Sequence, residues 1–111
     1  MIEVKEYLCS DGSSPFADWF NSLDTQAALK VNVYITRIGT GNTSNLKSIG
    51  DGVYECRIDW GPGYRVYLGK EGEKLVILLG GGTKRRQQAD IDYAKQLWTE
   101  YKRHKKEKGK K

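Results

Sequence analysis

The stretch that decides the fold is residues 53–68, VYECRIDWGPGYRVYL. Apolar and polar side chains alternate on both sides of a Gly-Pro-Gly turn at residues 61–63, which is typical of two antiparallel strands joined in a hairpin. The apolar faces of the two strands are expected to point into the core. That orientation places Arg57 and Arg65 together on the opposite face of the sheet.

Two further strands and one helix packed on the sheet are expected in the segments around this hairpin. Residues 2–8 alternate as a strand does, and the uniformly apolar residues 75–79 suit a strand that is covered on both faces. Ser14 is placed to cap a helix that starts at Pro15.

Two more helices complete the prediction. Asp24 is a suitable N-cap for a second helix, which Gly39 is expected to end in the left-handed conformation. The last helix is expected to begin at Thr83 or Lys84, and the polar, glycine-rich residues 39–52 are expected to form a long connection. The sequence therefore predicts one α+β domain over residues 1–101, in the order β-α-α-β-β-β-α, with helices packed on a mainly antiparallel four-stranded sheet.

The net charge of +5 depends on one end of the chain. Residues 102–111 carry seven Lys or Arg and one Glu, whereas the preceding 101 residues carry twelve basic and thirteen acidic residues. We expect this basic tail to be disordered and to serve mainly as a solubilising end. RNA binding by the domain therefore has to be argued from a local cluster of cations.

Composition also bears on location and on metals. No apolar run reaches the length of a membrane span, and the strand-like start does not read as a signal peptide, so a cytoplasmic protein is expected. Cys9 and Cys56 are expected to be reduced thiols. His104 is the only histidine, so neither a metal site nor a cofactor is expected.

The candidate site is a set of cations that the predicted fold places at one end of the sheet. Arg57 and Arg65, on neighbouring strands, are expected to form an anion-binding site. Lys84, Arg85 and Arg86 follow at the junction of a strand and a helix. Cations are disfavoured at a helix start unless an anion is bound there.

An alternative interpretation is purely structural. Arg57 lies between Glu55 and Asp59 in the sequence, so ion pairs could explain the arginines, and residues 84–86 could be a solvated surface.

Several short motifs resemble the RelE/ParE superfamily of toxins, and most closely its HigB-like branch, the addiction-module killer proteins. The resemblance covers roughly residues 2–101. It is carried by residues 54–58 (YECRI), 63–67 (GYRVY) and 78–84 (LLGGGTK), by 16–20 (FADWF), and by Gln88, Asp90, Ile91 and Ala94.

The resemblance implies a RelE-like fold and the toxin of a type II toxin–antitoxin system. Such a toxin cleaves mRNA on the ribosome without a metal, by attack of a 2′-hydroxyl on the adjacent phosphate, and so inhibits translation. It implies a cognate antitoxin, expected to carry a helix-turn-helix domain through which the complex binds promoter DNA. It assigns catalytic roles to Arg65, Lys84 and Arg85, and RNA or phosphate binding to Arg57, Arg86 and Lys47.

The sequence departs from the better-known toxins in its proton-transfer group. Ile91 stands where they carry a tyrosine, and the domain has no histidine. Asp90, Asp92, Tyr93 or a lysine with a lowered pKa could substitute, so the general acid is left unassigned. Two other functions therefore remain open: a ParE-like inhibitor of DNA gyrase, and an inactive relative that only binds the antitoxin.

Overall fold

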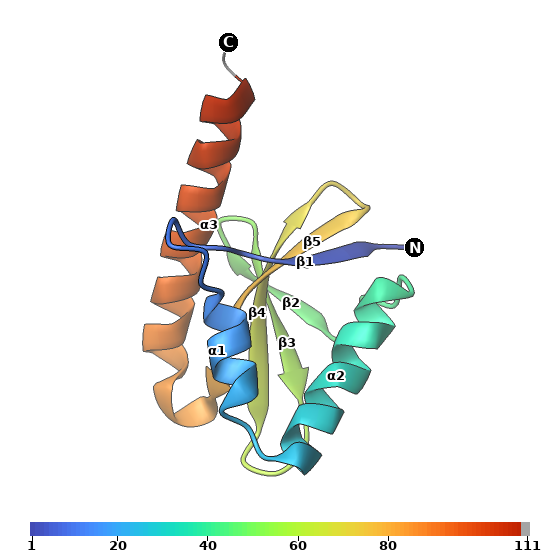
Figure 1. The fold of residues 1–111 in the computed structure, drawn as a ribbon. Coiled ribbons are helices and arrows are strands. Elements are labelled where there is room, and N and C mark those ends of the chain that lie inside the picture. The colour runs from blue at the N-terminus through green and yellow to red at the C-terminus, as the bar shows by residue number, and fades with distance from the viewer. Residues whose placement is uncertain (110–111) are drawn as a thin grey trace.

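The computed structural model describes residues 1–109, which form an α+β fold with a five-stranded mixed sheet and three α-helices (Figure 1). In chain order the elements are β1 (Glu3–Glu6), α1 (Pro15–Asn21), α2 (Thr25–Gly39), β2 (Leu46–Gly50), β3 (Val53–Ile58), β4 (Tyr64–Glu71), β5 (Leu75–Thr83), the 3-10 turn η1 (Lys84–Arg86) and α3 (Gln87–Gly109).

The strands lie in the order β1-β5-β4-β3-β2. Strand β1 pairs parallel with β5, and the other three pairings are antiparallel. The sheet therefore has one strand more than the four that were predicted. Strand β2 lies within residues 39–52, which were expected to form only a connection, and it pairs with β3 at the edge of the sheet.

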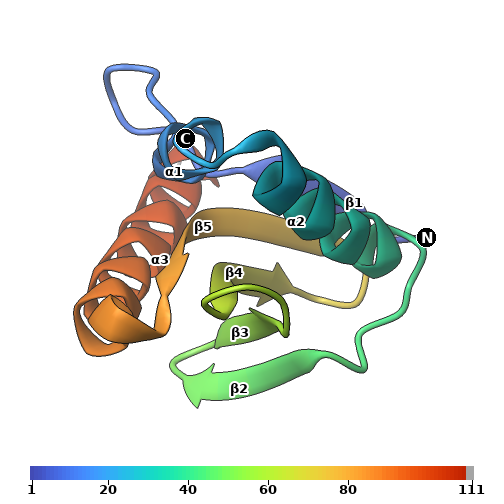
Figure 2. The ribbon, with the colours of Figure 1, turned by 90° about the horizontal axis from the view of Figure 1, so that it is seen from below.

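Helices cover both faces of the sheet (Figure 2). On one face α1 and α2 enclose a core that includes Phe16, Val31, Ile38, Cys56 and Val66. On the other face α3 packs on a second core, formed by Tyr7, Val53, Tyr67, Ile77, Leu79, Ala94, Leu97 and Trp98. The apolar run 75–79 is therefore buried on both sides, as predicted.

The first two helices begin where the sequence predicts. The Ser14 hydroxyl accepts a hydrogen bond from the Ala17 amide at 3.0 Å, and the Asp24 carboxylate accepts one from the Ala27 amide at 2.8 Å. Helix α2 ends differently from the prediction. Gly39 is its last helical residue, and the left-handed conformation falls at Gly41, whose φ is 98°.

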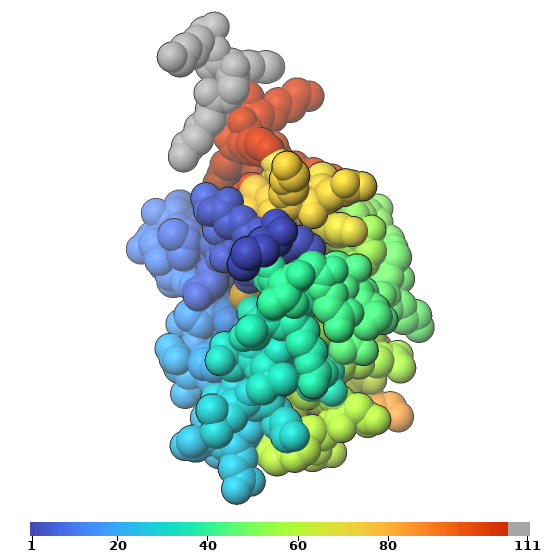
Figure 3. Space-filling view, turned by 90° about the vertical axis from the view of Figure 1, so that its right-hand side faces the viewer, coloured from blue at the N-terminus to red at the C-terminus, as the bar shows by residue number. Residues whose placement is uncertain are grey.

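Helix α3 is longer than predicted, because it continues to Gly109 and projects from the body (Figure 3). Residues 102–109 of the expected disordered tail are therefore helical in the structure, and residues 110–111 lie outside the described residues. Among the described residues, no helix is long and apolar enough to cross a membrane.

Candidate functional site

The two sheet arginines are direct partners across strands β3 and β4. Arg57 lies opposite Arg65 in the register of the hairpin, and opposed residues of antiparallel strands project from the same face. The prediction that the two arginines share a face is confirmed. It is the face on which α3 packs.

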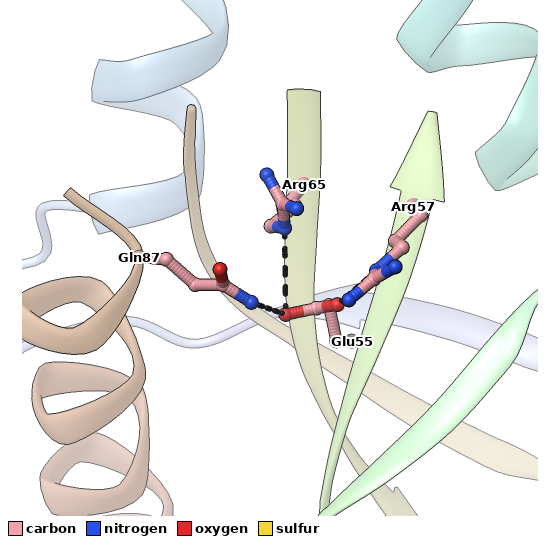
Figure 4. Close-up of polar contacts among 4 residues, drawn as sticks. All are labelled: Glu55, Arg57, Arg65 and Gln87. Carbon is pink, nitrogen blue, oxygen red and sulfur yellow. Dashed lines mark hydrogen bonds and ion pairs between the residues drawn. The ribbon is translucent and has the colours of Figure 1, made fainter. Parts of the chain in front are cut away.

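A buried glutamate lies between the two arginines. One carboxylate oxygen of Glu55, Oε1, accepts a hydrogen bond from the Nε of Arg57 at 2.7 Å. The other oxygen, Oε2, accepts one from the Nε2 of Gln87 at 2.8 Å and lies 3.6 Å from the Nε of Arg65. Figure 4 shows the three partners approaching this carboxylate from β3, β4 and the start of α3.

These partners keep Glu55 ionised inside the protein. The residue is only 1% exposed, and an unpaired charge at that depth is strongly unfavourable. Burial by itself raises the pKa of Glu55. The hydrogen bonds from Arg57 and Gln87 and the two positive charges outweigh this effect, so the pKa lies below its usual value of 4.5.

The cluster retains a positive charge, because one carboxylate is shared by two guanidinium groups. Arg65 is nearly buried, and its Nε lies at ion-pair distance from Glu55 without forming a hydrogen bond. Figure 4 shows the two terminal nitrogens of Arg65 pointing away from that carboxylate. The side chain of Arg57 is 55% exposed. The structural alternative therefore holds in part: Glu55 pairs with both arginines but can neutralise only one.

A second carboxylate, that of Asp90, lies against strand β5 on the same face of the sheet. Gly82 is the cross-strand partner of Arg65, and a β-carbon on Gly82 would overlap the Oδ2 of Asp90. The first turn of α3 thus places Asp90 over strand β5, next to the row formed by Arg57 and Arg65. Burial raises the pKa of Asp90 above its usual value, and the nearby charge of Arg86 only partly opposes the shift.

A small cavity adjoins Asp90 on the far side from Arg57. It has a volume of about 150 Å³ and is lined in part by Tyr67, Gly80, Asp90 and Tyr93. Tyr67 is the register partner of Glu55 and is buried, and its hydroxyl has no hydrogen-bond partner among the described residues. Burial raises the pKa of this phenol, and the charges of Glu55 and Asp90 raise it further, so Tyr67 stays neutral.

The remaining candidate cations lie on segments that adjoin this cluster. Lys84, Arg85 and Arg86 form η1, directly before Gln87, and all three are exposed. The last helical segment begins at Lys84, as predicted, but its first turn is the 3-10 turn η1, and the α-helix starts only at Gln87. Thr83, which precedes the turn, makes no side-chain capping hydrogen bond.

Lys47 lies on β2 directly opposite Glu55 and is exposed. It therefore lies on the same face as the arginines and not in a loop. None of the four cations outside the hairpin forms an ion pair with a carboxylate whose position the structure describes.

Sequence reasoning missed two members of the site. Glu55 was expected only as a possible ion-pair partner, and Gln87 was not considered. The signal for Glu55 was present, since it lies on the same face as Arg57 within one strand. Gln87 carries no such signal, because its partner is 32 positions away. Among residues 1–109 no group of three or more His, Cys, Asp or Glu side chains is placed to hold a metal ion.

One curated protein resembles this chain over most of its length. A protein of Haemophilus influenzae, described as uncharacterized, is 47% identical over 83 residues, which cover 74% of this chain and 84% of the relative. The chain belongs to the family of that protein. No protein-family model matches the chain. Because the relative is uncharacterized, the function has to be argued from the site.

Proposed function

We propose that the protein is the toxin of a type II toxin–antitoxin system, with a RelE/HigB-like fold, and that it acts as a metal-independent endoribonuclease on ribosome-bound mRNA. The observation that carries this proposal is the pair of guanidinium groups, Arg57 and Arg65, held side by side by the single buried carboxylate of Glu55. A net positive site of this kind suits a phosphate whose negative charge grows in the transition state.

In the proposed reaction, the ribose 2′-oxygen attacks the adjacent phosphorus and the bond from phosphorus to the 5′-oxygen breaks. The 2′-hydroxyl loses its proton to a base, and the leaving 5′-oxygen gains a proton from an acid. The products are a 2′,3′-cyclic phosphate and a 5′-hydroxyl. The reaction requires positioning, charge stabilisation and two proton transfers.

The residues divide these tasks. Arg57 and Arg65 bind the oxygens of the scissile phosphate, and Glu55 is a positioning residue because it is buried and touches both arginines. Asp90 is the proposed base: its carboxylate lies against Gly82, the cross-strand neighbour of Arg65, and its raised pKa makes it a better proton acceptor than an ordinary aspartate. Lys84 is the proposed proton donor to the leaving oxygen.

The other cations are assigned to the RNA on either side of the scissile phosphate. Arg85 and Arg86 are exposed on η1, and Lys47 is exposed on the neighbouring strand β2. Long cationic side chains without carboxylate partners are suited to phosphate groups of the mRNA or of ribosomal RNA. We assign Arg85 to the catalytic centre together with Lys84, and Arg86 and Lys47 to binding.

The cellular context of the proposal comes from the family resemblance. The protein would act in the cytoplasm and be held inactive by a cognate antitoxin that carries a helix-turn-helix domain. The complex would bind promoter DNA through the antitoxin.

Mapping of RNA ends in a translation reaction tests the proposal. Purified protein is expected to cut mRNA only when ribosomes are present. The new fragments should carry 5′-hydroxyl ends, and chelation of divalent metals from the protein before the assay should leave its activity unchanged. Intact mRNA in that reaction, together with inhibition of DNA supercoiling by purified gyrase, would replace this function with the gyrase alternative. Intact mRNA without gyrase inhibition would indicate the remaining alternative, an inactive relative that only binds the antitoxin.

A further inference from the structure

The small cavity beside Asp90 has walls that suit a cation. It has a volume of about 150 Å³ and lies where the start of α1 comes close to α3 near the end of strand β5 (Figure 1). We call it the edge cavity. The residues that form most of its wall are Tyr67, Leu79, Gly80, Asp90, Tyr93 and Ala94.

The edge cavity adjoins a part of β5 that has no neighbouring strand on one side. Strand β1 pairs with β5 only from Leu75 to Leu78, and Gly80 follows just beyond this pairing. A strand edge without a neighbour presents backbone N–H and C=O groups. Gly80 adds no side chain, and a β-carbon there would meet nothing within 4 Å. A ligand in the cavity can therefore approach the backbone of β5 closely.

Asp90 is the only charged side chain that lines the cavity, among the residues that the structure describes. Its carboxylate takes part in none of the ion pairs between described side chains. Burial raises the pKa of Asp90, and the charge of Arg86 opposes this shift only in part. The negative charge is therefore incompletely compensated, and a cation bound next to it would stabilise it.

Other acidic groups lie near the exposed side of the cavity. Tyr93 is 48% exposed, so it lies where the cavity meets solvent. Burial raises the pKa of Tyr93, and the charges of Glu100 and Asp18 raise it further. On the buried side, the hydroxyl of Tyr67 is neutral and has no hydrogen-bond partner among the described residues. A cation that enters past Tyr93 therefore meets hydrogen-bond acceptors and negative charge.

A primary alkylammonium ion fits this combination of groups. Its three N–H donors need acceptors, and the Asp90 carboxylate, the Tyr67 hydroxyl and the backbone carbonyls of β5 are available. Its methylene chain suits the apolar wall, to which Pro15, Leu79 and Ala94 contribute. A cavity of about 150 Å³ accepts a molecule of about the size of benzene, and n-butylammonium is slightly smaller. A metal ion fits poorly, because it needs several oxygen ligands and only one carboxylate lines the described wall.

We propose that the edge cavity binds a primary alkylammonium group whose charge pairs with Asp90. The group can belong to a free aliphatic diamine or to a lysine side chain of a partner protein, since both carry an ammonium on a narrow methylene chain. The binding itself does not depend on cleavage. Its consequence rests on the proposed function: a cation held on Asp90 makes the carboxylate a weaker base toward the 2′-hydroxyl, and so inhibits the toxin.

The experiment follows the backbone amide signals of the full-length protein by NMR while n-butylammonium chloride is added at neutral pH and constant ionic strength. 1-Butanol and butyrate are the neutral and anionic ligands of similar size. Asp90→Asn removes the carboxylate. Asp92→Asn is the matched control, because it changes an exposed carboxylate on the same turn. Gly80→Val is a second test variant, which fills the cavity and leaves Asp90 in place.

We expect n-butylammonium to shift the amide signals of Gly81 and Asp90 with a dissociation constant of about 1 mM, because so small a ligand forms few contacts. Asp90→Asn should weaken binding by about tenfold or more, and Gly80→Val should abolish it. Asp92→Asn should bind as wild type does. Equal affinity in wild type and Asp90→Asn, or 1-butanol that binds as tightly as n-butylammonium, would overturn the proposal. So would a wild-type protein whose signals do not respond.

Two further ligands distinguish the sources of the ammonium group. Tighter binding of diaminobutane than of Nα-acetyl-lysine methylamide indicates a free diamine, and the reverse order indicates a lysine of a partner; either order supports the proposal. The cleavage assay separates this proposal from the nuclease. A protein that binds n-butylammonium but cuts no mRNA keeps the edge cavity and rejects the nuclease, whereas one that cuts mRNA without binding n-butylammonium rejects the cavity proposal alone.

Discussion

The carboxylate of Asp90 lies directly against the backbone of Gly82, in a space that a β-carbon would occupy. Gly82 is in turn the cross-strand neighbour of Arg65. The missing side chain on β5 thus lets an acid from α3 pack against the strand that neighbours Arg65. Because Gly82 has no β-carbon, α3 can place Asp90 next to the candidate site.

Replacing Gly82 with alanine is expected to displace Asp90. The new β-carbon overlaps the carboxylate at the end of the Asp90 side chain, which can turn aside, so the variant should lose about 1 kcal/mol in the free energy of unfolding. Gly80→Ala is the matched control, because Gly80 lies two residues earlier on the same strand and face, where a β-carbon meets nothing within 4 Å. That control should change stability by less than about 0.5 kcal/mol. Urea denaturation compares them, and equal losses would contradict the placement of Asp90.

The role of Asp90 as a base predicts a change in the pH profile of cleavage. An ionised Asp90 is required, so wild-type activity should fall as the pH decreases toward its pKa, which burial raises above the usual 3.8. Asp90→Asn should reduce the cleavage rate by about 10²–10⁴-fold and abolish this acidic limb. Asp92→Asn, which changes an exposed carboxylate on the same turn, should leave rate and profile unchanged. An unaltered rate in the Asp90 variant would remove Asp90 from the mechanism.

The lowered pKa of Glu55 predicts a pH-dependent contribution to stability. A carboxyl group whose pKa is lower in the folded protein than its usual 4.5 stabilises the fold fully above that value, and the contribution is lost as the pH falls through the folded-state pKa. Glu55→Gln should be less stable than wild type by about 1–3 kcal/mol at pH 7. The difference should shrink below pH 4.5.

Thermal unfolding from pH 7 to pH 3 measures this effect. Glu3→Gln is the control, because Glu3 pairs with Lys5 on the exposed surface and such pairs contribute about 0–1 kcal/mol. A stability difference for Glu55→Gln that stays constant across the range would show that the carboxylate is not preferentially ionised in the folded protein.

Most of the fold could be predicted because its signals are local. The alternation over residues 53–58 sets the faces of β3, and Ser14 and Asp24 mark helix starts through hydrogen bonds three residues away. Strand β2 escaped prediction because it lies at the sheet edge with mostly exposed side chains, so no apolar alternation marks it. The glycines on both sides of β2 are also typical of a loop.

The candidate site could be predicted only in part, because its members meet through tertiary contacts. The register of one hairpin brings Arg57 and Arg65 together, and that register follows from sequence. The burial of Glu55 depends on α3 covering the polar face, which the alternation alone marks as exposed. The contact of Gln87 with Glu55 depends on the 3-10 turn that precedes α3, and the sequence predicts a helix from Lys84 without distinguishing this turn from the α-helix.

The paired guanidinium groups are proposed to act on the scissile phosphate, and the cleavage rate of Arg57→Gln tests this role most directly. Arg57 is half-exposed, so its replacement should leave the protein folded, whereas the nearly buried Arg65 is better tested as Arg65→Lys, which keeps the charge but loses the planar group. The charge-matched control is Arg37→Gln on α2. In a translation reaction with ribosomes, we expect both site variants to cut mRNA about 10²–10³-fold more slowly than wild type and the control to cut at the wild-type rate. Folded Arg57 and Arg65 variants that cut as fast as the control would contradict the account.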